Sequence, residues 1–129
     1  MKQNLISLLV LCAFLVGCKA TGNSATPSRT PTQTYQEMVA AIKSSDVGKF
    51  KSLISKSALA LIQGSAKKNG KSLDDELKSF MKETPVDNAQ FRNETISGNR
   101  ASVEGNSGSG WSKTWFTIED GEWKLALDK

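Results

Sequence analysis

Large apolar residues recur every three or four positions between residues 35 and 81, which is the spacing of one helix face. The first such stripe contains Tyr35, Met38, Val39 and Ile42. The last contains Leu73, Leu77, Phe80 and Met81. After residue 86 the spacing falls to two, as in strands that bury one face. The pattern predicts an α+β domain in which N-terminal helices pack on a curved antiparallel sheet.

Capping residues locate the helix starts. Four helical segments are expected, at residues 30–43, 47–54, 58–62 and 72–84. Thr30 and Gln33 can form a capping box, and Pro31 suits the first helical position. Asp46 and Ser72 can cap the second and fourth segments. The third segment is expected to be only a turn or two long, because Gly64 follows it closely.

Turn residues divide the C-terminal part into strands. Four strands are expected, at residues 91–97, 100–104, 110–119 and 122–127. Gly98-Asn99 and Asp120-Gly121 are two-residue hairpin turns, and residues 105–110 form a looser loop. Trp111 and Trp115 fall on one face of the third strand, and Phe116 and Ile118 fall on the other. The core face is expected to hold Phe116, Ile118, Trp123, Leu125 and Leu127.

An apolar run occupies residues 5–16, after a short basic start. It is too short to cross a bilayer, which needs about 20 apolar residues, so it indicates a secretory signal. The run ends in Leu15-Val16-Gly17-Cys18, which resembles the lipobox of bacterial lipoproteins. The resemblance implies cleavage between Gly17 and Cys18, a diacylglyceryl group on the Cys18 sulfur and an acyl group, such as palmitate, on the new amine. Two or more acyl chains anchor a protein firmly in a membrane.

The lipobox resemblance divides the chain into three parts. Residues 1–17 are a signal peptide, residues 18–29 a flexible tether of small polar residues, and residues 30–129 the folded domain. The domain is expected outside the cytoplasm, on the cell membrane or the outer membrane. Lys19, in place of aspartate, resembles lipoproteins that are sent on to the outer membrane.

Composition limits the chemistry of the domain. The chain has 129 residues, a net charge of +4, two cysteines and no histidine. With Cys12 in the signal and Cys18 lipidated, neither a zinc site nor a Ser-His or Cys-His nucleophile can be built. No metal or cofactor is therefore expected. The basic residues 67–71 carry no aromatic residue for base stacking, so they are interpreted as a solvated loop, with no nucleic-acid partner.

The domain resembles the NTF2-like (cystatin-like) superfamily, and within it the small lipoproteins of the DUF4878 type. The residues that carry the likeness are Thr34-Tyr35, Ala40-Ala41-Ile42, Asp46 and the segment Asp120-Gly121-Glu122-Trp123-Lys124-Leu125. It implies a cone, in which a bent sheet wraps around the first helix and leaves a pocket. The superfamily contains both enzymes and non-catalytic binding modules, so the fold does not choose between them.

Three functions stay open at this point. The first is a non-catalytic module that binds a small ligand, a glycan or an envelope protein through the cone mouth or a face with Trp111, Trp115 and Tyr35. The second is an enzyme acting on a small apolar substrate, for which Tyr35 and Glu94 are the candidate pocket residues. The third is a scaffold that homodimerises through the outer face of the sheet.

Overall fold

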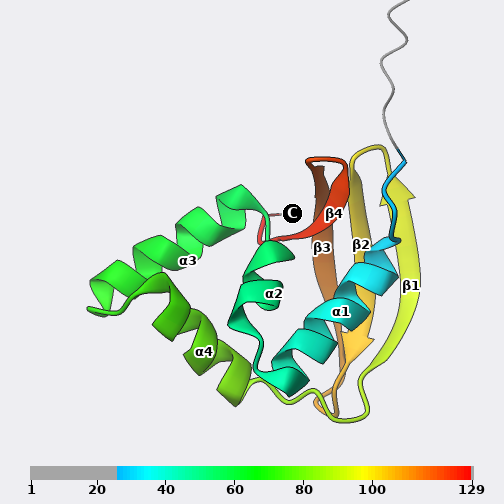
Figure 1. Ribbon diagram of the computed structural model, residues 1–129. Helices are drawn as coiled ribbons and strands as arrows, with labels where there is room; N and C mark the ends of the chain where they lie inside the picture. Colours follow the sequence, from blue (N-terminus) through cyan, green and yellow to red (C-terminus); the bar gives the residue numbers. More distant parts are fainter. Residues whose placement is uncertain (1–25, 129) are drawn as a thin grey trace, which may run out of the picture.

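The structure, a computed structural model, describes residues 26–128. Helices come first in the chain and strands follow (Figure 1). The helices are α1 (Pro31–Ser44), α2 (Val47–Ser52), α3 (Lys56–Lys68) and α4 (Leu73–Glu83). The strands are β1 (Gln90–Ser97), β2 (Arg100–Asn106), β3 (Trp111–Glu119) and β4 (Glu122–Ala126). The predicted α+β class is confirmed.

The four strands form one antiparallel sheet in the order β1-β2-β3-β4. Both predicted hairpin turns are present. Asp120 and Gly121 have φ angles of 53° and 76°, and Gly98 has a φ of 59°. In the Asp120-Gly121 turn, two successive residues have positive φ angles. This geometry matches the twist of the flanking strands β3 and β4, so the turn joins them without splaying them.

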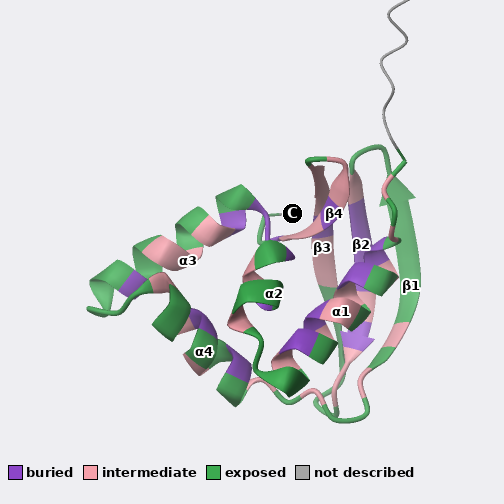
Figure 2. Cartoon of the chain, viewed as in Figure 1, coloured by how far each residue is buried: buried purple, intermediate pink, exposed green. Residues whose placement is uncertain are grey.

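Helix α1 lies across one face of the sheet, which we call the inner face; α2 lies beside α1, and α3 and α4 extend to the side (Figure 1). Strand pairing puts Ala101 opposite Phe116, and Phe116 opposite Leu125, on that face. Phe116, Ala101 and Val103 are buried there against Met38 of α1 and Phe50 of α2. Figure 2 shows the buried positions on the sides of α1 and β2 that face each other. The predicted split of β3 into a Phe116 face and a Trp115 face is confirmed.

The segment after α2 runs along the free edge of β4. Leu125 N donates to Leu53 O at 2.8 Å, and Ser55 N donates to Leu125 O at 2.9 Å. Ile54 is thereby paired in parallel with Leu125. These hydrogen bonds occupy backbone groups on an edge that would otherwise be open to another strand.

The predicted helix caps are present. Thr30 Oγ1 accepts from Gln33 N at 3.1 Å, and Gln33 Oε1 accepts from Thr30 N at 2.8 Å, which completes the capping box. Asp46 accepts from Lys49 N at 2.9 Å. Ser72 caps α4 in the same way. Each cap satisfies a backbone N–H that the helix itself leaves without a partner.

The prediction for α3 is wrong in length. The helix runs through Gly64 and ends at Lys68. Ser55 caps its start, and the burial of Ala58 and Ala66 on one side stabilises the helix on both sides of Gly64. One glycine in a helix costs only about 1 kcal/mol, which tertiary packing offsets. Lys67 and Lys68, expected in a loop, lie in the last turn of α3, where the helix dipole favours positive charge.

The strand ends differ by a few residues from the prediction. β2 continues through Gly105 and Asn106, which were expected in the loop, because both pair with β3. Leu127, predicted as core, lies beyond the end of β4 and is 52% exposed. Phe80, predicted in the buried stripe of α4, is also 52% exposed.

A bulge in β1 connects the sheet to the start of α1. Arg92 pairs with Glu104 and Thr95 with Ser102, so β1 carries an extra residue between these pairs. Asn93, inside the bulge, has a φ of 52°, and Glu94 accepts from Thr32 N at 2.8 Å. The first turn of α1 has no acidic residue of its own. Glu94 therefore supplies the negative charge that a helix N-terminus favours.

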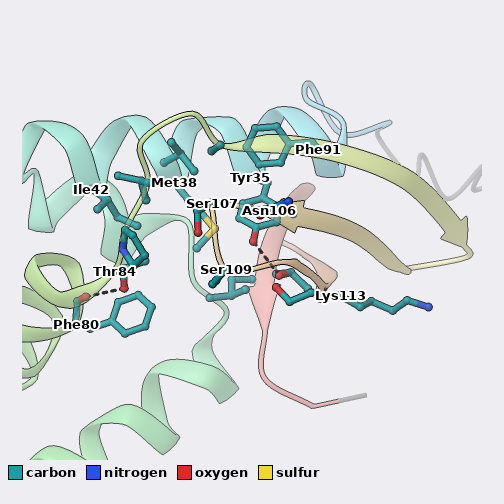
Figure 3. Close-up of a pocket in the computed structure, with 18 of the residues that line it drawn as sticks. Tyr35, Met38, Ile42, Phe80, Thr84, Phe91, Asn106, Ser107, Ser109 and Lys113 are labelled. Carbon is teal, nitrogen blue, oxygen red and sulfur yellow. Dashed lines mark hydrogen bonds between the residues drawn. The ribbon is translucent and has the colours of Figure 1, made fainter.

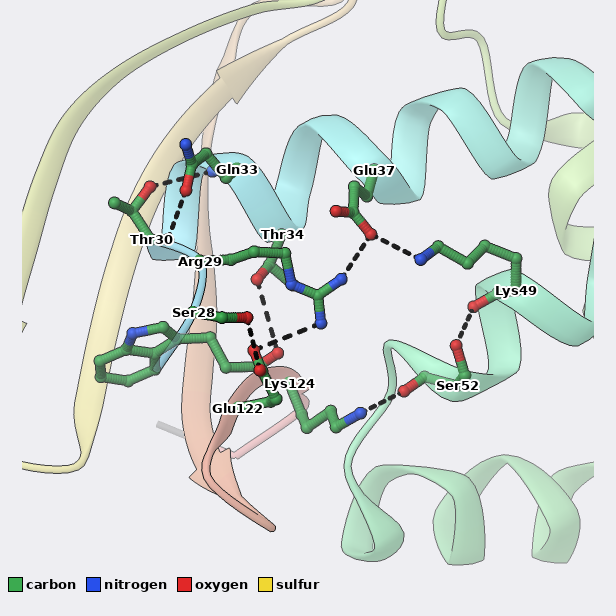
Figure 4. Close-up of polar contacts among 11 residues, drawn as sticks. Ser28, Arg29, Thr30, Gln33, Thr34, Glu37, Lys49, Ser52, Glu122 and Lys124 are labelled. Atoms are coloured by element: carbon green, nitrogen blue, oxygen red, sulfur yellow. Dashed lines mark hydrogen bonds and ion pairs between the residues drawn. The ribbon is translucent and has the colours of Figure 1, made fainter. Parts of the chain in front are cut away.

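The residues just before α1 join a cluster of ion pairs (Figure 4). Arg29 contacts Glu37 of α1 and Glu122 of β4, and Lys49 of α2 lies 2.7 Å from the same Glu37 oxygen. Ser28 donates to Glu122 at 2.6 Å. Residues 28 and 29, which the sequence assigns to the tether, are thus held against the domain.

This cluster makes folding sensitive to acid. Hydrogen bonding from Lys49, helped by the charge of Arg29, lowers the pKa of Glu37, and contacts with Ser28 and Arg29 lower the pKa of Glu122. A lowered carboxyl pKa adds stability above the unfolded pKa of about 4.3, and that stability is lost as the pH falls through the folded pKa. We predict that E37Q flattens the loss of stability below about pH 4.5, measured by urea unfolding between pH 6 and 3.

The matched control is E83Q. Glu83 lies at the end of α4 and forms no ion pair among the described residues. E83Q should leave the pH dependence of the unfolding free energy as in the wild type. An E37Q profile as steep as that of the wild type would show that the cluster does not contribute.

Candidate functional site

A cavity of about 440 Å³ lies between α1, the end of α4 and the inner face of the sheet (Figure 3). Its volume is in the range of small-molecule sites, about 300 to 1,000 Å³. The whole predicted apolar stripe of α1 lines it, from Tyr35 to Ile42. The opposite wall comes from β2, β3 and the end of β4, and the segment of residues 84–89 closes one side.

The cavity exists because the inner face carries small side chains at one end. Near the turn at residues 120–121, the large residues Ile118 and Trp123 face each other across β3 and β4. At the other end Gly105 is paired with Ser112, and Thr114 follows on the same face. Apart from the Tyr35 ring, which contacts Gly105 and Thr114, nothing on these short side chains fills the distance to α1, so space between helix and sheet stays open there.

Tyr35 stands at the centre of the lining. Its ring packs edge-on against Phe91, with centroids 4.9 Å apart, and at a tilt against Phe116 at 5.8 Å. Thr114 Oγ1 donates to the Tyr35 hydroxyl at 3.2 Å. A Cβ on Gly105 would lie 2.6 Å from the Tyr35 hydroxyl oxygen, so only glycine leaves room for the ring at this position.

Two exposed apolar side chains line the cavity as well. Phe80 of α4 stacks on Phe50 with centroids 5.8 Å apart, and Leu127 follows β4. Phe80 belongs to the apolar face of its helix, as its spacing predicts, but it faces the unfilled space. This explains why both residues are exposed and why the apolar surface continues from the cavity to solvent.

The structure does not bring the predicted pair Tyr35 and Glu94 into one pocket. Glu94 binds Thr32 at the start of α1 and does not line the cavity. Within the described residues, no aspartate or glutamate lines this cavity. Its polar side chains are hydroxyls and one amide, apart from Lys113 at the end of its lining.

The three residues proposed for a binding face are divided between two places. Tyr35 lines the cavity from α1, whereas Trp111 and Trp115 share the outer face of β3; Trp115 still borders the cavity lining, and Trp111 does not. Trp111 lies on the outer face, where the Arg92 guanidinium sits 3.8 Å above its ring. Arg92 also donates to Glu104 at 2.8 Å, and this hydrogen bond, with a second from Asn93, lowers the pKa of Glu104. On the outer face, Arg92 therefore contacts both the Trp111 ring and the Glu104 carboxylate.

The predicted lipidation residues lie outside the described part of the chain. Cys18 and Gly17 precede residue 26, where the description begins. Within residues 26–128 no helix has the length and apolar content needed to cross a membrane. The same residues contain no group of three cysteine, aspartate or glutamate side chains that could hold a metal ion.

Comparison of the chain with protein-family models, with curated proteins and with solved structures found no match. The geometry of the cavity is therefore the main guide to function.

Sequence reasoning missed the small residues that make the cavity. Gly105 was assigned to a loop, and Ser112 and Thr114 were not considered as pocket residues. A signal was present, because all three fall on the same alternating face as Phe116. A core face that changes from large to small side chains along its strands indicates a gap in the packing.

We predict that G105A destabilises the domain by about 1 to 3 kcal/mol, because the added methyl group overpacks the contact with Tyr35. The measurement is urea unfolding followed by circular dichroism. The control is G64A. Nothing lies within 4 Å of a Cβ on Gly64, and alanine favours a helix, so G64A should stabilise by about 0.5 to 1 kcal/mol. Equal effects of the two substitutions would refute the close contact.

Proposed function

We propose that this chain is a lipid-anchored protein of the cell envelope whose domain binds a small, mainly apolar ligand without catalysing a reaction. The observation that carries the proposal is the cavity of about 440 Å³ between α1 and the sheet. Apolar side chains with a few convergent polar groups are typical of ligand sites. Among the described residues, the lining offers hydroxyl groups for orientation and no carboxylate for an acid-base pair with Tyr35.

We propose further that the domain is an NTF2-like cone of the DUF4878 type. Helices before an antiparallel meander, with α1 across the inner face, support this assignment (Figure 1). The cavity between α1 and the sheet also supports it, since the resemblance implies a pocket at this place. In such an arrangement the ligand is held by the sheet, α1 and the end of α4 together.

The anchor in this proposal is the lipid on Cys18, after cleavage of residues 1–17. A tether from residue 18 would end at Ser28 and Arg29, which contact β4 and α1. A coil of about ten residues has an average span of roughly 18 Å, so the domain would stay close to the membrane surface. An apolar ligand dissolved in that membrane would be within reach.

The anchor predicts a labelling result. Cells that express the full chain and are fed an alkyne fatty acid should label the wild-type protein, because Cys18 and the new amine become acylated. C18A should abolish the label. C12A is the matched control, since it changes the other cysteine, within the signal, and should keep the label. Labelled C18A would exclude this anchor.

The cavity predicts a retained ligand. Full-length protein isolated from its envelope and released from detergent micelles should carry a non-covalent adduct in native mass spectrometry. I42W should lose the adduct, because Ile42 lines the cavity and indole fills it. L61W adds the same side chain on α3, where Leu61 is exposed and does not line the cavity, and should keep it. An adduct that persists in I42W would place binding elsewhere.

A further inference from the structure

The lining of the cavity restricts the charge of its ligand; this inference rests on the proposed ligand-binding function. Tyr35 and Lys113 are the ionisable side chains among the described lining residues. The Lys113 side chain extends away from the cavity in Figure 3, and its ammonium lies 5.6 Å from the Trp115 ring centroid. A charged ligand group inside would therefore have no oppositely charged side chain to pair with, which disfavours its burial. The lining therefore favours an uncharged ligand.

One hydrogen-bond donor is fixed in the lining. The Tyr35 oxygen accepts from Thr114, so its own O–H remains available to donate. Phe91, Phe116 and Gly105 hold the ring from three sides. A donor held in place in this way loses little entropy on binding, which favours one oxygen acceptor on the ligand at this position.

Most of the lining along α1 is apolar. Met38, Val39 and Ile42 line the cavity along α1, and Leu125 lines it from the sheet. Phe80 and Leu127, each 52% exposed, extend this surface to solvent. A volume of about 440 Å³ is in the range of small-molecule sites. This size leaves room for a single apolar chain.

We propose that the cavity binds an uncharged lipid-like molecule, one apolar chain with a single hydroxyl or carbonyl oxygen that accepts a hydrogen bond from Tyr35. The chain lies along the apolar stripe of α1 and extends toward Phe80. Thr114 is a positioning residue, because it orients the Tyr35 hydroxyl and leaves its proton for the ligand.

Photolabelling in isolated membranes that contain the full-length protein tests this. The probe is a long-chain alcohol with a diazirine and a terminal alkyne, used beside the carboxylic acid and the hydrocarbon of the same length. We expect the alcohol to label the protein most strongly, at peptides that contain cavity residues. Removing one hydrogen bond, worth about 0.5 to 1.5 kcal/mol, should lower alcohol labelling about two- to tenfold in Y35F.

The hydrocarbon probe separates loss of the hydrogen bond from loss of the fold, because its labelling should be the same in Y35F and in the wild type. T114V should give a smaller loss for the alcohol, and T117V, on the outer face of β3 and outside the lining, should give none. Strong alcohol labelling in Y35F, or preferred labelling by the acid, would overturn this inference while leaving ligand binding intact. No cavity labelling by any of the three probes would overturn the proposed function itself.

Discussion

The close packing of Tyr35 against the bare backbone of Gly105 determines how α1 crosses the sheet. The ring is held between Phe91 and Phe116, and a single methyl group on Gly105 would collide with it. Next to this contact the inner face of β3 carries the short side chain of Ser112, and space remains between helix and sheet there. Protein interiors are otherwise packed about as densely as organic crystals, so an opening of this size marks a place where the sequence avoids filling the core.

Local signals in the sequence were sufficient for most of the fold. Caps, hairpin turns and the alternation in β3 depend on neighbouring residues, and these predictions are confirmed. The parallel pairing of Ile54 with Leu125 was not predicted, because it joins residues far apart in the chain through backbone atoms. The length of α3 was also missed. There the packing of Ala66 outweighs the local effect of Gly64.

Less of the candidate site than of the fold could be predicted from the sequence. Tyr35 was considered as a pocket residue because it is the only tyrosine, and its side chain lines the cavity. Glu94 was paired with it on residue type alone, but a bulge turns Glu94 toward the start of α1. Trp111 and Trp115 were considered because they are large aromatic residues. Gly105 shapes the cavity because it has no side chain. The absence of a side chain becomes informative only when the strand register is known.

The central claim is that the space between α1 and the sheet is open and apolar in the folded protein. A crystal structure of the protein determined under xenon pressure tests it directly, because xenon enters dry apolar cavities. We predict xenon density between Met38, Ile42 and Leu125, with the Tyr35 ring unchanged against Gly105. A core closed by inward movement of these side chains, with no xenon between α1 and the sheet, would contradict the account.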